Sequence, residues 1–116
     1  MNEIENRPWG TFEILHEDDI CKIKKIEVFP YHRLSYQIHN HRDEHWFVIS
    51  GEGVVVINGI GKRIVKGDSI DIPRNSAHRV INTTTDNINL TFIEVQTGDY
   101  FGEDDIIRLE DDYGRS

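Results

Sequence analysis

Side chains able to bind a metal or a sugar are concentrated in one short stretch, residues 37–46, which reads QIHNHRDEHW. The chain has six histidines, and His39, His41 and His45 fall in this stretch together with Glu44. Imidazole nitrogens and carboxylate oxygens are common protein ligands of divalent metals. A hydrophobic core does not require such residues, so the stretch predicts a metal site or a sugar pocket inside a barrel.

The residues that lead into this stretch alternate between two kinds of side chain. One set consists of Leu34, Tyr36 and Ile38, and the other consists of Ser35, Gln37, His39 and His41. Because successive side chains of a strand point to opposite faces, residues 34–41 are predicted to form a half-buried strand. Its polar face is expected to carry the chemistry.

The elements that must position these side chains are short strands separated by Gly, Pro and Asn turns. Strands are predicted at residues 11–15, 20–29, 34–41, 45–50, 54–57, 62–65, 69–72, 78–81 and 88–96. No helical period of useful length precedes the acidic tail, residues 100–115, which could hold a helical turn or two. The pattern therefore predicts an all-β antiparallel barrel or sandwich.

Composition predicts one globular domain without a membrane span. The 116 residues suffice for a single hydrophobic core, and no apolar run approaches the roughly 20 residues that cross a bilayer. The N-terminal residues lack the basic and apolar regions of a secretory signal. The single cysteine, Cys21, cannot form an intramolecular disulfide, so a cytoplasmic location is expected.

The charge balance argues against a nucleic-acid partner. The chain has 21 acidic and 13 basic residues and a net charge of −8, whereas nucleic-acid binding needs a positive surface. An anionic small molecule is still compatible with this composition, because a few converging arginines can outweigh the net charge locally.

A second polar stretch, residues 67–82, completes a resemblance to the cupin superfamily. The first cupin motif, G-x5-H-x-H-x4-E-x6-G, is matched by Gln37, His39, Glu44 and Gly51, with Gln37 in the place of the first histidine. The second motif, G-x5-P-x-G-x2-H-x3-N, is matched by Gly67, Pro73, His78 and Asn82. Tyr31 and Asn75 stand where the motifs usually have glycine, and both positions are expected to be turns.

The cupin resemblance implies a double-stranded β-helix, which is a jelly-roll barrel, and a set of metal ligands. The ligands that it implies are Gln37, His39, Glu44 and His78. An alternative takes His39 and His41 as the histidine pair, but the interval from His41 to Glu44 is then too short for the motif. These donors suit one divalent ion, with Zn²⁺ as the first choice and Mn²⁺, Co²⁺ or Fe²⁺ as alternatives.

A narrower resemblance covers nearly the whole chain. Its motifs include Arg-Pro-Trp-Gly at 7–10, His-Arg-x-Glu-His-Trp at 41–46, Ile-Glu-Val-Gln at 93–96 and Tyr-Gly-Arg at 113–115. Together they resemble the type II mannose-6-phosphate isomerase domain, which usually ends a bifunctional enzyme after a GDP-mannose-forming transferase domain. The chain resembles the isomerase domain alone. The expected domain is 1–116, with the barrel over about 9–97 and the tail over 98–116.

The isomerase resemblance implies site residues beyond the metal ligands. Isomerisation moves a proton between C2 and C1 of an open-chain sugar phosphate, so it needs a base and an anchor for phosphate. Arg108 and Arg115 are expected to bind the phosphate, and in a helical tail their spacing would place them on one face. Arg42 is expected to contact the phosphate or the enediolate.

The base is expected to be His45, because an imidazole can exchange protons near neutral pH. Strict alternation places His45 on the face opposite Glu44, unless a turn or a bulge re-aims it. Glu94, in the last predicted strand, is the alternative base. His41 shares the ligand face and is expected to contact the substrate.

Three functions compete at this point. The first is a metal-dependent isomerase that interconverts mannose 6-phosphate and fructose 6-phosphate, and the second is an isomerase of another sugar phosphate, such as glucose 6-phosphate. The third is a non-catalytic cupin that binds a metal and a sugar phosphate. A homodimer is a further expectation, because cupin barrels often pair through their sheets.

Overall fold

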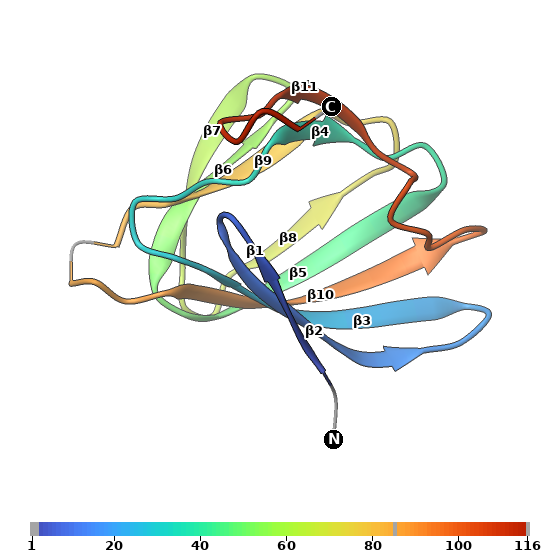
Figure 1. Cartoon of the computed structure of the whole chain (residues 1–116), viewed down its shortest axis with the longest axis horizontal. Helices are drawn as coiled ribbons and strands as arrows, with labels where there is room; N and C mark the ends of the chain where they lie inside the picture. The colour runs from blue at the N-terminus through green and yellow to red at the C-terminus, as the bar shows by residue number, and fades with distance from the viewer. Residues whose placement is uncertain (1–2, 85, 116) are drawn as a thin grey trace.

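Across residues 3–84 and 86–115, which the computed structural model describes, the chain forms eleven β-strands and no helix (Figure 1). The strands are β1 (Ile4–Arg7), β2 (Gly10–Glu17), β3 (Cys21–Val28), β4 (Tyr36–Ile38), β5 (Arg42–Ser50), β6 (Glu52–Ile57), β7 (Ile60–Val65), β8 (Ser69–Ile72), β9 (His78–Asn82), β10 (Leu90–Gly98) and β11 (Ile107–Glu110). The all-β architecture expected from the sequence is confirmed. None of the described residues belongs to a helix with the length and apolar character needed to cross a membrane.

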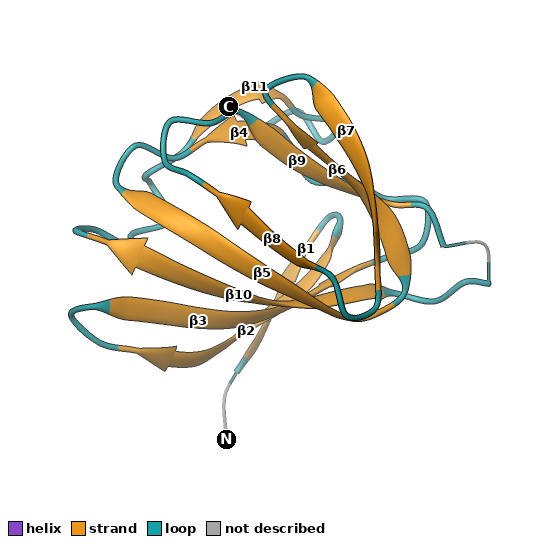
Figure 2. Cartoon of the chain, turned by 180° about the vertical axis from the view of Figure 1, so that it is seen from behind, coloured by secondary structure: helices purple, strands orange, loops and turns teal. Residues whose placement is uncertain are grey.

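Two antiparallel sheets face each other and enclose the interior, as both views of the chain show (Figures 1 and 2). The six-stranded sheet has the order β1-β2-β3-β10-β5-β8, and the five-stranded sheet has the order β11-β4-β9-β6-β7. Neighbours in each sheet include strands far apart in the sequence, such as β10 between β3 and β5. This pairing brings the two polar stretches of the sequence to one interior.

The interior changes from apolar to polar along the central strands. On β10, the buried apolar residue Phe92 is followed on the same face by the buried acid Glu94. On β3 the change occurs between Ile26 and Lys24, and the register pairs Phe92 with Ile26 and Glu94 with Lys24. The apolar end is filled by a cluster that comprises Trp9, Phe12, Ile26, Val28, Trp46, Val48, Val55, Ile64, Ile70, Ile72, Val80, Leu90 and Phe92. The polar end is available for a site.

The strand expected at residues 34–41 is shorter than predicted. β4 ends at Ile38, the chain turns at residues 40–41, and β5 begins at Arg42. The turn shifts the alternation by one residue, because buried positions are odd-numbered up to His39 and even-numbered from Arg42. Arg42 and Glu44 therefore face the interior together with His39.

The tail was expected to be short and irregular or helical. Beyond β10, its described residues are irregular apart from one short strand, β11, and none is helical. β11 pairs antiparallel with β4 and places Arg108 opposite Gln37. The free edge of β4 presents backbone N–H and C=O groups that a strand can satisfy. Edge pairing therefore prevails over a local helical preference in this acidic segment.

Two of the positions where cupin motifs usually have glycine adopt the left-handed backbone conformation. Tyr31 has a φ of 64° and Asn75 a φ of 66°. Asparagine is among the residues that tolerate this conformation best, whereas for a bulky residue such as tyrosine it is uncommon. Both positions are turns, as the motif match predicted.

Candidate functional site

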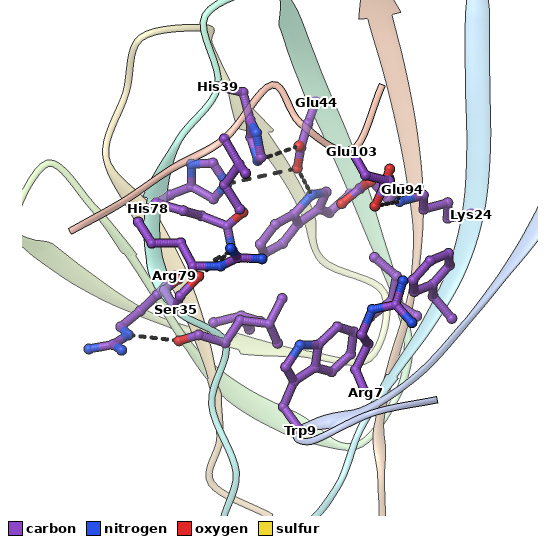
Figure 3. Close-up of a pocket in the computed structure, with 18 of the residues that line it drawn as sticks. Arg7, Trp9, Lys24, Ser35, His39, Glu44, His78, Arg79, Glu94 and Glu103 are labelled. Carbon is purple, nitrogen blue, oxygen red and sulfur yellow. Dashed lines mark hydrogen bonds and ion pairs between the residues drawn. The ribbon is translucent and has the colours of Figure 1, made fainter. Parts of the chain in front are cut away.

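The polar end of the barrel contains a pocket lined by residues from both sheets (Figure 3). Its polar lining consists of Arg7, Lys24, Ser35, Gln37, His39, Arg42, Glu44, His78, Arg79, Glu94, Glu103, Arg108 and Arg115. Trp9, Phe12, Ile26, Leu34, Trp46, Val80 and Ile106 supply its apolar walls. A pocket with apolar walls and converging polar groups is typical of a small-molecule site.

His39, Glu44 and His78 form a compact group of metal-binding donors at one side of this pocket. Their side chains point toward one another in Figure 3, and each residue is only 4% exposed. Oε2 of Glu44 lies 3.3 Å from Nε2 of His39, and Oε1 lies 4.0 Å from Nε2 of His78. One ligand atom from each of the three lies within 4.8 Å of the others. The structure thus brings together three of the four predicted ligands.

Backbone carbonyls orient both imidazoles so that the same ring nitrogen faces the site. Nδ1 of His39 donates to the carbonyl oxygen of Asp105 at 2.6 Å, and Nδ1 of His78 donates to that of Ser76 at 3.1 Å. Nε2 of each ring is then the nitrogen with a lone pair. A hydrogen bond to the distal nitrogen is how metal-ligating histidines are usually held.

Two further observations support a neutral His39 whose Nε2 carries the lone pair. Burial lowers the pKa of His39 to about 4, so the ring is uncharged at neutral pH. Arg42 donates from its Nη2 to Nε2 of His39 at 3.1 Å, which requires that nitrogen to be an acceptor.

Glu44 is an ionised carboxylate inside the protein. Burial opposes its ionisation, but the positive charge of Arg42 outweighs this and holds the pKa of Glu44 well below its ordinary value. Arg42 Nε donates to Oε2 at 2.9 Å, and Trp46 Nε1 donates to Oε1 at 2.9 Å. Two buried imidazoles and one fixed carboxylate are a donor set that fits a divalent cation.

Gln37, the fourth predicted ligand, lines the same pocket from β4. It is 9% exposed and lies opposite His78 in the sheet register. Its Nε2 donates to the backbone oxygen and to Oγ of Ser35, at 3.3 and 3.2 Å. The amide nitrogen is therefore engaged, and Oε1 is the atom that could bind a cation.

Glu94 is the candidate base that the structure places in the pocket. Its side chain is 5% exposed, and burial, followed by the negative charge of Glu44, raises the pKa of Glu94 to about 8. Gln96 donates a hydrogen bond to it. A carboxyl group with a pKa near the working pH is suited to taking up and releasing protons.

His45, the residue first expected to be the base, does not lie in the pocket. Alternation along β5 turns its side chain, which is half exposed, to the outer face of the sheet, where Nδ1 pairs with Asp71 of β8. The turn at residues 40–41 sets this alternation with Glu44 inward, and no bulge intervenes before His45. The structure therefore does not place His45 where it could act as a base in this pocket.

His41 also lies outside the pocket, although it was expected to contact the substrate there. Its side chain is 55% exposed, and its Nδ1 lies 3.5 Å from Asp99. Because β4 ends before the turn, His41 does not continue the inward face that His39 begins. Arg42 takes the inward position in its place.

The three predicted arginines all line the pocket. Arg42 is buried, Arg108 comes from β11, and Arg115 lies beyond it in the tail. The Arg115 guanidinium pairs with Asp111, with Nη2 to Oδ1 at 2.9 Å. The structure thus brings Arg108 and Arg115 to one pocket by strand pairing, without the shared helical face expected from their spacing.

Several lining residues were not predicted as site residues. Lys24 is 4% exposed and its Nζ donates to both carboxylate oxygens of Glu103, at 3.0 and 2.9 Å. Arg7 and Trp9 line the pocket from the start of the chain. A signal for Lys24 was present in the sequence, because alternation places it on the same face of β3 as the core residue Ile26.

Cationic side chains outnumber carboxyl groups in the pocket lining, although the chain is acidic. Its lining includes six cationic side chains, Arg7, Lys24, Arg42, Arg79, Arg108 and Arg115, and three carboxyl groups, Glu44, Glu94 and Glu103. The raised pKa of Glu94 further reduces the negative charge at neutral pH. Arg79 and Arg115 pair with Glu110 and Asp111 beside the lining. The lining is nevertheless richer in cationic side chains than the chain as a whole, whose net charge is −8, and so suits an anionic ligand.

Comparisons with known proteins point to one family. The family model described as "Mannose-6-phosphate isomerase C-terminal" matches residues 2–111. The alginate biosynthesis protein AlgA of Pseudomonas aeruginosa is 44% identical over 110 residues, which are 95% of this chain and 22% of AlgA. The mannose-1-phosphate guanylyltransferase ManC of Salmonella typhimurium is 42% identical over 109 residues, which are 94% of this chain and 22% of ManC. The chain thus spans 22% of the length of these two relatives.

Solved structures resemble the chain in fold. An RmlC-like cupin from Shewanella frigidimarina has a TM-score of 0.76 and 22% identity, over 89% of this chain and 87% of that protein. The capsular polysaccharide assembling protein CapF from Staphylococcus aureus has a TM-score of 0.79 and 18% identity, over 95% of this chain and 34% of CapF. These likenesses confirm the cupin double-stranded β-helix that the paired motifs predicted.

Proposed function

Because the chain belongs to the mannose-6-phosphate isomerase C-terminal family, we propose that it is a metal-dependent isomerase of mannose 6-phosphate and fructose 6-phosphate. The observation that carries the proposal is the meeting of two features in one pocket. Three buried metal-binding donors, His39, Glu44 and His78, share it with a surplus of cationic side chains. The guanylyltransferase activity named in the relatives is not extended to this chain, which spans 22% of their length.

The metal would be held by His39, Glu44 and His78, with the amide oxygen of Gln37 as a fourth ligand. When bound, a divalent ion supplies electrophilic stabilisation of negative charge that develops on substrate oxygens. Zn²⁺ is the first choice for this donor set, and Mn²⁺, Co²⁺ or Fe²⁺ are alternatives.

The arginines serve to bind and orient the sugar phosphate. Arg108 and Arg115 are assigned to the phosphate, because a planar guanidinium matches phosphate oxygens in charge and geometry. Arg42, which already contacts His39 and Glu44, is assigned to the oxygens near the reacting carbons. Anchoring one end of the open-chain sugar places its C1 and C2 at a defined distance from the donors.

Glu94 is assigned the proton transfer. Its carboxylate would remove the proton from C2 of the aldose and return it to C1, while a proton moves from the C2 oxygen to the C1 oxygen, which gives the ketose. Burial and the negative charge of Glu44 raise the pKa of Glu94. A positive charge bound beside Glu44 would offset the Glu44 charge and lower the pKa of Glu94. The ionised Glu94 carboxylate, which accepts the proton, would then be favoured.

A coupled assay tests the proposal. Purified chain is stripped with a chelator, reloaded with single divalent metals and supplied with fructose 6-phosphate. Metal-dependent formation of mannose 6-phosphate is the expected result. Glucose 6-phosphate as the sole product would assign a different sugar, and tight sugar-phosphate binding without turnover would assign a non-catalytic binding protein. Full activity in the chelated protein would overturn the role of the metal.

The phosphate assignment makes a separate prediction. Arg115→Ala is expected to raise KM for the phosphorylated sugar by an amount equivalent to roughly 1–3 kcal/mol, the range for loss of a charge-assisted hydrogen bond, with a smaller change in kcat. Steady-state kinetics measure both constants. Arg63→Ala, which removes an exposed arginine from β7, is the matched control. Equal effects of the two substitutions would remove Arg115 from the phosphate site.

A further inference from the structure

The segment between β10 and β11, residues 99–106, crosses the polar end of the barrel and makes contacts on both of its sides. Figure 1 shows it running from the end of β10 past the start of β5 toward β11. Glu103 pairs with Lys22 and Lys24 of β3. Asp105, two residues later, contacts the turn between β4 and β5. The segment thus reaches the part of the chain that carries the metal ligands.

Asp105 makes three contacts with three consecutive residues of that turn. Its carboxylate accepts the backbone N–H of Asn40 at 2.9 Å with Oδ1 and that of His41 at 3.0 Å with Oδ2. Its backbone oxygen accepts Nδ1–H of His39 at 2.6 Å. The residue is 7% exposed, so these hydrogen bonds are shielded from water. One residue therefore holds both the ligand ring and the backbone that follows it.

We propose that Asp105 is a positioning residue for the metal centre, which sets the tautomer and direction of His39 and the inward turn of Arg42 and Glu44. This inference rests on the metal centre of the proposed function. The turn at residues 40–41 is where the alternation of inward side chains shifts by one residue. Without the shift, Glu44 would face outward and the three donors would not meet.

The geometry explains why a carboxylate at position 105 is suited to holding the turn at residues 40–41. Two consecutive backbone N–H groups of the turn reach one carboxylate, and its two oxygens accept one hydrogen bond each. A side-chain amide has one acceptor oxygen and would present its NH₂ group to the second N–H. An alanine would leave both N–H groups without these partners, at a cost to the turn.

The neighbouring acid, Asp104, provides a matched control. Its Oδ1 accepts a hydrogen bond from Tyr100 OH within the same segment, and the residue is exposed. Asp104→Ala therefore removes the same charge, one residue away, without touching the Asn40 and His41 amides.

The test measures metal affinity and the His39 tautomer. Co²⁺ titration, followed by its visible absorption, is expected to show a loss of about 10–100-fold in affinity for Asp105→Ala, the range typical of losing a partner that orients a metal ligand. Asp105→Asn is expected to lie between Asp105→Ala and the unchanged chain, and Asp104→Ala to match the unchanged chain. Long-range ¹H–¹⁵N NMR of the metal-free protein is expected to show His39 protonated at Nδ1. Asp105→Ala keeps the backbone oxygen that accepts Nδ1–H, but it removes the carboxylate that holds this oxygen beside the turn, so a mixture of His39 tautomers is expected in that variant.

Unchanged Co²⁺ affinity together with an unchanged tautomer in Asp105→Ala would overturn the inference, as would an equal loss of affinity in Asp104→Ala. If Asp105→Ala does not fold, as judged by circular dichroism, the near-isosteric Asp105→Asn carries both measurements. If the unchanged chain does not bind Co²⁺, the proposed metal centre fails. The NMR experiment still decides whether Asp105 sets the His39 tautomer, so the two failures are distinguishable.

Discussion

His78→Ala is expected to lower divalent-metal affinity by more than about 100-fold, because loss of a partner that merely orients a ligand already costs 10–100-fold. The substitution removes one of two imidazole nitrogens that face Glu44. Metal-dependent isomerisation is expected to be lost with the metal, whereas the β-sheet circular dichroism signal is expected to remain. The apolar cluster around Trp46 and Phe92 is built from other residues, and the His78 ring meets it edge-on at Trp46, with the ring centroids 6.1 Å apart.

Elemental analysis after dialysis, together with isothermal titration, measures the metal bound to each variant. His41→Ala is the matched control, because it removes an imidazole whose ring is 55% exposed and outside the pocket. The control is expected to retain metal. Unchanged metal content in His78→Ala would remove this histidine from the ligand set and would require a different centre.

Glu94→Gln is expected to lower kcat by about 10²–10⁴-fold, the range for loss of a general acid–base group, while the metal is retained. Glutamine keeps the size and hydrogen-bonding capacity of the protonated side chain but cannot exchange a proton. KM is expected to change less than kcat, because the phosphate arginines are untouched. Steady-state kinetics on metal-loaded protein make this measurement.

In the metal-free state, Glu94→Gln is expected to become more stable relative to the unchanged chain as the pH rises. An acid whose folded pKa is raised to about 8 holds a proton that the unfolded chain loses near its ordinary pKa of 4.5. Stability of the unchanged chain therefore falls across the interval between these two values. Glu94→Gln lacks this titration, so its advantage in denaturant unfolding is expected to grow from acid to mildly alkaline pH.

His45→Ala separates the two candidate bases. The His45 side chain lies on the outer face of β5 and pairs with Asp71, so its removal is expected to leave kcat near that of the unchanged chain. A large loss of kcat in His45→Ala with little loss in Glu94→Gln would reverse the assignment made from the pocket.

The fold was predictable from alternation and turn residues, and the centre of the site from the resemblance to the two cupin motifs. Alternation and turn residues predicted short antiparallel strands, because the side-chain period of two and the turn propensities of Gly, Pro and Asn are local properties. The match of Glu44 and His78 to two separate motifs predicted that they meet, and the strand order accounts for that meeting.

The misplaced residues have one physical cause. Whether His41 and His45 face inward depends on the length of β4 and on the turn at residues 40–41. That turn is held by the carboxylate of Asp105, which comes from a segment more than sixty residues later in the chain. Alternation read along a single strand does not contain this information.

The tail shows the same limitation. Its acidic composition and the spacing of Arg108 and Arg115 were compatible with a helix, but the edge of β4 selects a strand. Pairing with that edge is a tertiary effect that overrides local preference. The position of Lys24, by contrast, was predictable from local sequence. Alternation along β3 places this lysine on the same inward face as the core residues of the strand.

The three donors are divided between the two layers of the barrel. His39 follows β4 and His78 begins β9 in the five-stranded sheet, whereas Glu44 lies on β5 in the six-stranded sheet. A cation bound by all three would link the two sheets to each other. A ligand that binds only the folded chain raises the free energy of unfolding. Loss of the ion would then lower the free energy of unfolding of the chain as well as its proposed activity.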